Sequence, residues 1–229
     1  LEQPVAQIAE HALRGVAHED RLPEVGEPLH GEDDDDAGDE HGKEAGADAV
    51  LHGIDAGLTK QVARERLTED ERQAILGRIS VTDDLHGLKD CDLVIESIVE
   101  DMATKRELFE HLDRIVKPEA IIATNTSTLA VVELAMVTER PDKVCGIHFF
   151  NPAPMMKLVE VIRPLTASDE TIDAAVEFAT TCGKDAVQVQ DRAGFVVNAL
   201  LFPYLNNAIR MWEQGTASMD DIDTAMMGG

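Results

Sequence analysis

The sequence is short of basic residues, cysteine and aromatic side chains. Lysine and arginine number 20 against 45 aspartates and glutamates, so the formal net charge is −25 over 229 residues. This balance argues against nucleic acids and anionic membranes as main partners, because both recognise basic surfaces. The three cysteines lack the spacing of metal ligands, so no metal site is expected, and they fit a reducing compartment such as the cytoplasm.

Long apolar runs are also missing. No stretch approaches the roughly 18 uninterrupted apolar residues that a membrane span needs, and the first residues do not form a secretory signal. Apolar residues still make up 44 % of the chain, which is normal for a globular protein. The length allows one large domain or two small ones with a buried core.

Residues 1–50 differ from the rest of the chain. They contain 15 acidic and 3 basic residues and no Phe, Tyr or Trp, and four aspartates are adjacent at 33–36. Like charges repel, and little apolar surface lies nearby to offset the entropy of ordering. We therefore expect residues 1–52 to form an atypical, mostly disordered acidic segment, with at most a short helix at 3–16.

From residue 53 onward, apolar runs alternate with amphipathic segments. This alternation predicts an α/β fold with a parallel sheet over residues 53–190. Residues 191–229 begin an all-α region, with a long apolar helix at 195–214 and a last helix capped by Ser218. The spacing predicts strands at 93–95, 120–123, 144–150, 158–162 and 186–189, and helices at 54–67, 69–78, 102–116, 129–137 and 169–182.

Residues that can do chemistry follow the predicted strands. In open parallel sheets, ligands bind beyond the carboxyl ends of the strands. Glu100 and Lys105 follow the first strand, Asn125-Thr126-Ser127-Thr128 follows the second, and His148 and Asn151 end the third. Loops are polar in any protein, so position alone leaves open whether this edge is functional.

His148 and Glu160 both lie in apolar runs. If their strands are neighbours, Glu160 can accept a hydrogen bond from one ring nitrogen of His148, which leaves the other nitrogen free to take a proton. A purely structural ion pair is the alternative. Asn198 also lies in an apolar run, where its amide serves either local packing or a ligand.

Several motifs together resemble the L-3-hydroxyacyl-CoA dehydrogenase family, and within it the bacterial 3-hydroxybutyryl-CoA dehydrogenases. The resemblance covers about residues 53–229. The motifs that carry it are Asn125-Thr126-Ser127-Thr128-Leu129, His148-Phe149-Phe150-Asn151-Pro152, Lys157-Leu158-Val159-Glu160 and Gly194-Phe195-Val196-Val197-Asn198.

The resemblance implies a Rossmann-type domain followed by a helical domain that forms a homodimer. It also implies oxidation of an (S)-3-hydroxyacyl-CoA by NAD or NADP. In that family His148 matches the general base and Glu160 the carboxylate that orients it. Ser127 and Asn198 match residues that bind the substrate, and Ser127 is also close to the nicotinamide. The remaining matches are cofactor contacts, at Glu100, Lys105 and Asn151, and candidates for the CoA phosphates, at Lys60 and Arg64.

Two parts of the family pattern are missing from this sequence. Residues 1–50 contain neither the apolar first strand nor the Gly-x-Gly-x-x-Gly turn that holds the cofactor pyrophosphate. The sequence also stops where the helical domain begins. The expected fold is thus an incomplete Rossmann-type sheet followed by a truncated all-α domain.

These departures leave two other functions open. One is a catalytically silent protein that binds CoA esters or a partner subunit. The other is a dehydrogenase of a different hydroxyacid. In either case, an uncovered apolar helix at 195–214 predicts self-association.

Overall fold

A computed structural model of the protein describes residues 41–229, and side chains from residue 50 onward. The described chain divides into two compact units. The first unit takes in residues up to 98 together with 110–122, and the second unit takes in 99–109 and 123–229. The expected helix at 3–16 and most of the expected acidic disordered segment lie outside the described residues.

The first unit opens with two helices. Helix α1 spans His41–Ala63 and α2 spans Glu69–Leu76. The expected start of the first helix at residue 54 is wrong, and so is the expectation of disorder for 41–52. Helix α1 contains four glycines, two of them within 41–52, which lower its helical propensity, so local sequence gives no signal for a helix that nonetheless forms.

The predicted start of the second helix is confirmed. The Thr68 hydroxyl accepts a hydrogen bond from the Glu71 amide at 3.2 Å, and the Thr68 amide donates to the Glu71 carboxylate at 2.8 Å, which makes a capping box. Arg72 on α2 forms an ion pair with Asp55 on α1 at 2.5 Å. This basic side chain is thus a paired surface charge that joins the two helices.

The remaining elements follow the predicted alternation. The first unit also contains the short helix η2 (Leu85–Leu88) and strand β1 (Leu93–Glu96). Helix α3 and strand β2 each have residues in both units. The other elements are α3 (Met102–Ile115), β2 (Ile121–Thr124), α4 (Val131–Ala135), η3 (Pro141–Lys143), β3 (Val144–Phe149), β4 (Leu158–Arg163), α5 (Asp169–Thr181), β5 (Asp185–Gln190), α6 (Val197–Glu213) and α7 (Met219–Gly228).

The α/β fold class is confirmed, but the sheet is not wholly parallel. Its strand order is β1-β2-β3-β4-β5, and β4 pairs with β5 in parallel. Strand β3, however, pairs with β4 in antiparallel fashion. The connection between them, residues 150–157, is too short for the crossover of a dozen or more residues that a parallel pair requires.

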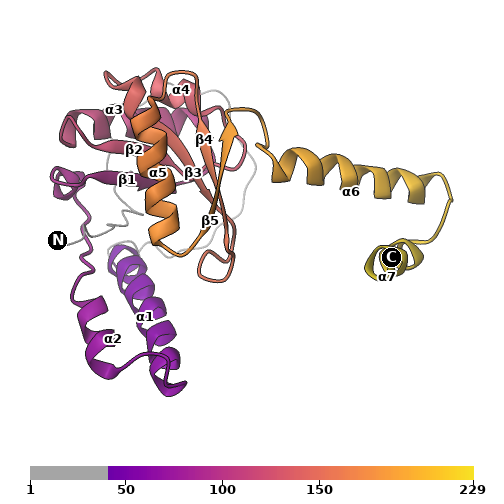
Figure 1. The fold of residues 1–229 in the computed structure, drawn as a ribbon, viewed down its shortest axis with the longest axis horizontal. Coiled ribbons are helices and arrows are strands. Elements are labelled where there is room, and N and C mark those ends of the chain that lie inside the picture. Colours follow the sequence, from indigo (N-terminus) through magenta and orange to yellow (C-terminus); the bar gives the residue numbers. More distant parts are fainter. Residues whose placement is uncertain (1–40) are drawn as a thin grey trace, which may run out of the picture. The chain divides into compact units, whose positions relative to one another are not determined.

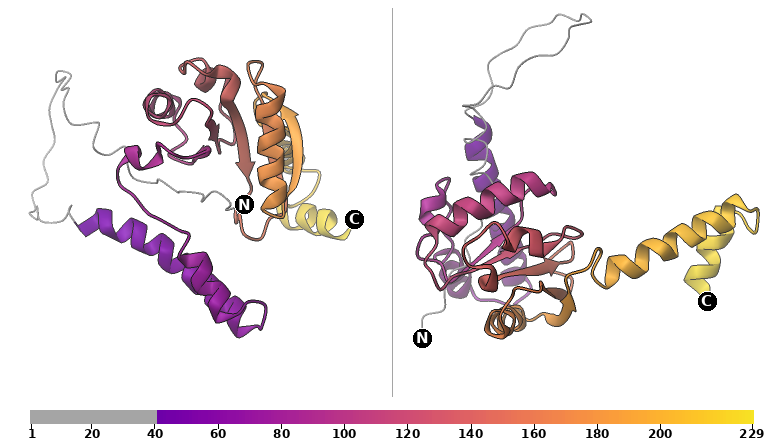
Figure 2. Two further views of the ribbon diagram at one scale, coloured as in Figure 1. Left: turned by 60° about the vertical axis from the view of Figure 1, so that its left-hand side comes forward. Right: turned by 90° about the horizontal axis from the view of Figure 1, so that it is seen from above.

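The core of the second unit is built around β3. Residues 144–148 of this strand are all buried. Helix α5 contacts β3, β4 and β5 and lies alongside these strands in both views (Figures 1 and 2). Gly146 pairs with Ile162 across the β3–β4 ladder, and a Cβ at Gly146 would lie 2.8 Å from the Ile162 side chain. Only glycine fits at this crossing.

Helices α6 and α7 have no buried residue. Large apolar side chains of α6 are exposed, including Leu200 at 70 % and Phe202 at 53 %. Pro203 lies inside the helix, as the sequence indicates. Within residues 41–229 no helix combines the length and the hydropathy that a membrane crossing requires.

Candidate functional site

The antiparallel β3–β4 ladder places His148 directly opposite Glu160. Directly opposed residues on neighbouring strands point to the same face, so their side chains meet. The His148 Nδ1 atom lies 2.9 Å from Glu160 Oε2. Both residues are buried, at 4 % and 1 % exposure. The two strand segments are therefore neighbours, as the predicted pairing of these side chains requires.

The second oxygen of Glu160 is also occupied. Glu160 Oε1 accepts hydrogen bonds from the Val196 and Val197 amides, each at 3.0 Å. These amides belong to the first turn of α6, where Val196 has no side chain able to cap the helix. Glu160 thus caps α6 from the neighbouring strand while it binds His148, and the buried carboxylate has partners on both oxygens.

The turn before α6 makes this contact possible. Gly194 has φ +75° and Phe195 has φ +50°, so two consecutive residues lie in the left-handed region. A Cβ at Gly194 would lie 2.9 Å from the Ala199 backbone nitrogen, so only glycine fits there. The Phe195 ring lies 5.5 Å from the His148 ring, centroid to centroid, and packing helps to hold this strained residue in place.

The free nitrogen of His148 faces a hydroxyl. Ser127 Oγ, in the loop after β2, lies 3.1 Å from His148 Nε2. A carboxylate only accepts hydrogen bonds, so the neutral imidazole carries its proton on Nδ1 and presents a lone pair at Nε2. Asn198 Nδ2, on the second residue of α6, donates to the Ser127 carbonyl at 3.4 Å. Strands β2, β3 and β4 and helix α6 thus converge on one imidazole.

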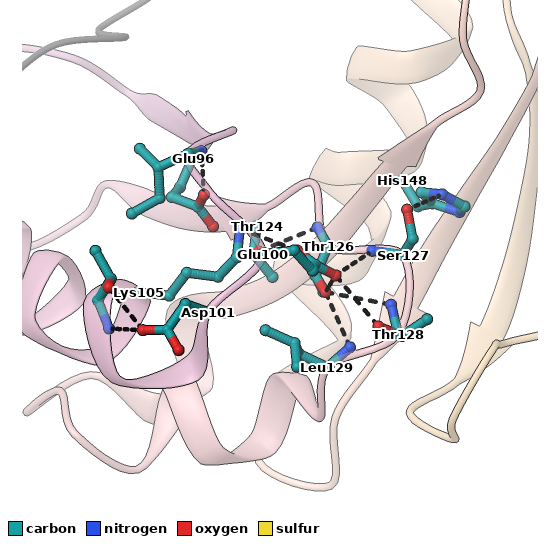
Figure 3. A network of polar contacts seen from close by, with 12 residues as sticks. Glu96, Glu100, Asp101, Lys105, Thr124, Thr126, Ser127, Thr128, Leu129 and His148 are labelled. Atoms are coloured by element: carbon teal, nitrogen blue, oxygen red, sulfur yellow. Dashed lines mark hydrogen bonds and ion pairs between the residues drawn. The ribbon is translucent and has the colours of Figure 1, made fainter. Parts of the chain in front are cut away.

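Glu100 holds the loop that carries Ser127 (Figure 3). Its Oε1 accepts from the Thr126 hydroxyl at 2.5 Å and from the Ser127 amide at 3.0 Å, and the Lys105 ammonium lies 3.3 Å from Oε2. Burial alone would raise the pKa of Glu100. The hydrogen bonds from Thr126 and Ser127 and the charge of Lys105 outweigh burial and lower that pKa below its ordinary value.

Not every predicted site residue joins this network. The network brings together Ser127, His148, Glu160 and Asn198, with Glu100 and Lys105 behind Ser127. Asn151 lies in the exposed turn after β3. Lys60, in the last turn of α1, and Arg64, just after that helix, are exposed in the first unit.

Three groups of the network have no individual role in the sequence analysis. They are the buried hydroxyl of Thr126, the amides of Val196 and Val197, and Asn125, whose Oδ1 accepts from the Phe149 amide at 2.8 Å. Asn125 and Thr126 stand in a motif that the sequence shows, but their partners are distant in the chain. Backbone amides leave no signal in a sequence at all.

Comparisons with known proteins identify the family of this chain. The family model described as 3-hydroxyacyl-CoA dehydrogenase, NAD binding domain, matches residues 40–192, and the model for the C-terminal domain of the same family matches 194–229. The chain belongs to the 3-hydroxyacyl-CoA dehydrogenase family, and the predicted resemblance is confirmed.

Individual relatives are similar over most of this chain. A 3-hydroxybutyryl-CoA dehydrogenase of Mycobacterium tuberculosis is 47 % identical over 174 residues, which are 75 % of this chain and 61 % of the relative. The mitochondrial hydroxyacyl-coenzyme A dehydrogenase of Rattus norvegicus is 45 % identical, over 77 % of this chain and 58 % of its own.

A solved structure shows the same architecture. The crystal structure of (S)-3-hydroxybutyryl-CoA dehydrogenase from Ralstonia eutropha has a TM-score of 0.79 and 37 % identity, over 81 % of this chain and 66 % of that one. The chain thus spans about three fifths of the length of the two sequence relatives named above.

Proposed function

We propose that this chain acts in the oxidation of an (S)-3-hydroxyacyl-CoA, with 3-hydroxybutyryl-CoA as the favoured substrate, to the 3-oxoacyl-CoA. The observation that carries the proposal is the arrangement of His148: Nδ1 on the Glu160 carboxylate and Nε2 beside the Ser127 hydroxyl, at the end of β3. Family membership and the names of the relatives support the substrate class.

The roles of the side chains follow from their chemistry. His148 Nε2 takes the proton of the 3-hydroxyl group, and Glu160 holds the ring in the tautomer that leaves Nε2 free. Glu160 then stabilises the positive charge that the ring gains. The Ser127 hydroxyl and the Asn198 amide hold the reacting oxygen, because both lie at the same edge and both can donate a hydrogen bond.

The residues at this edge fit the nicotinamide end of NAD or NADP. When bound, the cofactor supplies the acceptor for the hydride that leaves C3. Ser127 would lie close to the nicotinamide, and Glu100, Lys105 and Asn151 are the other cofactor contacts that the family resemblance implies. The sequence contains no Gly-x-Gly-x-x-Gly turn, so it offers no counterpart of the family's pyrophosphate site.

The proposal also covers the domain bounds, the CoA contacts, the homodimer and the cellular compartment. Residues 53–190 would form the cofactor domain and 191–229 the start of the helical domain. Lys60 and Arg64 are exposed cations suited to CoA phosphates, and the helical domain would serve a homodimer. Among the described residues none of the three cysteines forms a disulfide, and the proposal places the chain in the reducing cytoplasm.

The test is NADH oxidation by the full chain with acetoacetyl-CoA, followed as loss of absorbance. We expect His148→Gln to lower kcat about 10²- to 10⁴-fold, the usual contribution of a positioned base. His86→Gln, an exposed histidine of the first unit, is the matched control and should leave kcat unchanged. Oxidation that does not depend on the CoA ester, or that survives His148→Gln, would overturn the proposal.

Acyl-CoA binding without turnover is the outcome that favours the second candidate, a silent CoA-ester-binding protein. The missing glycine turn is the observation behind that candidate. Activity on free hydroxyacids but not on CoA thioesters would instead point to a different hydroxyacid dehydrogenase.

A further inference from the structure

The carboxylate of Glu100 collects donors from three consecutive residues of one loop. Its Oε1 accepts from the Thr126 hydroxyl at 2.5 Å, from the Ser127 amide at 3.0 Å and, more weakly, from the Thr128 hydroxyl at 3.4 Å (Figure 3). A carboxylate oxygen has two lone pairs, so these donors saturate it. This oxygen is therefore already engaged within the protein.

The other oxygen of Glu100 forms an ion pair with a buried cation. Lys105 is 1 % exposed, and its ammonium lies 3.3 Å from Glu100 Oε2. The Glu100 side chain itself is 40 % exposed. Its ion pair with the buried Lys105 therefore keeps it in one orientation. The next residue, Asp101, accepts from the Thr104 amide at 2.9 Å and fixes the start of α3.

The buried hydroxyl of Thr126 connects Glu100 to the rest of the loop through hydrogen bonds. While it donates to Glu100, it accepts from the Leu129 amide at 2.9 Å and from the Thr128 amide at 3.3 Å. The Thr126 hydroxyl thus links Glu100 to the amides of Thr128 and Leu129. Hydrogen bonds that lead to Glu100 therefore hold the turn on both sides of Ser127. Ser127 Oγ then lies 3.1 Å from His148 Nε2.

We propose that Glu100, backed by Lys105, is a positioning residue that fixes the loop of residues 126–128 and so holds the Ser127 hydroxyl against His148 before any cofactor binds. The resemblance to the family implies only a cofactor contact for Glu100. The catalytic consequence of the proposal rests on the proposed function, whereas the ordering of the loop does not. The two are therefore tested separately.

The first experiment uses the full chain without cofactor or substrate, by NMR. The signals of the His148 ring are identified by their loss in His148→Gln. In Glu100→Ala we expect the Ser127 amide to exchange at least about tenfold faster with solvent, because a charge-assisted hydrogen bond is lost. The Nε2 signal should shift as Ser127 moves away. Glu100→Gln should restore most of both, since its amide oxygen accepts from the same donors.

The matched control is Glu107→Ala, which removes an exposed carboxylate from α3, the helix that follows Glu100 and carries Lys105. It should leave the Ser127 exchange rate and the His148 signals unchanged. If Glu100→Ala fails to fold by circular dichroism, Thr126→Val removes the Thr126 hydrogen bond to Glu100 with little change of shape, and by loosening the loop it should move both readouts in the same direction but less far. Unchanged exchange and unchanged ring signals in the folded variant would overturn the proposal.

The second experiment separates positioning from cofactor contact. If the proposal holds, Glu100→Ala lowers kcat about tenfold or more while KM for NADH stays within about twofold. A raised KM for NADH with kcat unchanged would instead show a cofactor contact and contradict the proposal. A wild-type chain without turnover would defeat the proposed function alone, because the NMR result still decides the role of Glu100.

Discussion

The edge of the sheet around His148 and the helices α6 and α7 belong to the same unit, but they are held by different means. His148 and Glu160 are almost wholly buried, and each has polar partners on both sides. Helix α6 buries none of its residues, and its contact with this edge is made by its first turn. Side chains at the edge are thus fixed by hydrogen bonds within the chain, whereas most of α6 presents apolar surface to solvent.

Removing the charge of Glu160 should affect the edge most. In Glu160→Gln the side-chain amide group must face either His148 Nδ1 or the α6 amides, so one set of donors loses its acceptor. We expect kcat to fall about 10²- to 10⁴-fold, through loss of the correct tautomer. Steady-state kinetics with acetoacetyl-CoA measures this. Glu177→Gln, an exposed carboxylate on α5, is the control, and an equal loss in that variant would refute the assignment.

The turn at Gly194, which joins the edge of the sheet to α6, should show the next largest effect of substitution. Gly194→Ala places a methyl group 2.9 Å from the Ala199 nitrogen at φ +75°. Gly183 has a similar φ of +72°, but a Cβ there meets nothing within 4 Å. We expect Gly183→Ala to cost about 1 kcal/mol of unfolding free energy and Gly194→Ala about 2–3 kcal/mol, since only the second adds a backbone clash to the strain.

Urea unfolding of both glycine variants gives these values, and kcat gives a second reading. Because the turn holds the α6 amides on Glu160, Gly194→Ala should also lower kcat, whereas Gly183→Ala should not. Equal destabilisation by the two substitutions would show that the close approach of Gly194 to α6 is unimportant.

Glu100 should make the stability of the edge depend on pH. Its pKa is lower in the folded protein, so it contributes stability above its ordinary pKa of 4.5 and loses it as the pH falls through the lower folded value. The unfolding free energy of the wild type should therefore drop more steeply below about pH 4.5 than that of Glu100→Gln. Urea unfolding at a series of pH values tests this, with Glu107→Gln as control. Parallel curves for wild type and Glu100→Gln would contradict it.

The smallest effect on the fold should come from the exposed face of α6. Replacing Leu200 and Phe202 by Gln removes apolar groups that are 70 % and 53 % exposed, so unfolding of the sheet should change by less than about 0.5 kcal/mol. The association of the chain should weaken, because an apolar patch is lost. Light scattering reads the mass, and Asn206→Gln is the control. A wild-type chain that is a monodisperse monomer would disprove the predicted association.

Much of this organisation can be predicted from the sequence. Periodicity indicates the strands and most helices, Thr68 and Glu71 mark a helix start, and the motifs around His148 indicate the family. The antiparallel β3–β4 pair was missed because strand–helix alternation favours a parallel sheet. The short connection at 150–157 was the available signal.

Other features could not be read from the sequence. The start of α1 is hidden by glycines, which local propensity counts against a helix. The use of both Glu160 oxygens depends on backbone amides 36 and 37 residues away, and no side chain encodes them. Glu100 is similar, because a resemblance names it as a cofactor contact while its bonds to Thr126 and Ser127 appear only in three dimensions.

A double-mutant cycle on kcat with His148→Gln and Glu160→Gln shows whether Glu160 acts through the His148 ring. If the Glu160 carboxylate works by orienting the His148 ring, Glu160→Gln lowers kcat about 10²-fold or more in the wild type. In the His148→Gln background it should lower kcat less than about threefold. If the two losses instead multiply, each group contributes to the reaction independently, and the pairing seen at 2.9 Å is not the source of activity.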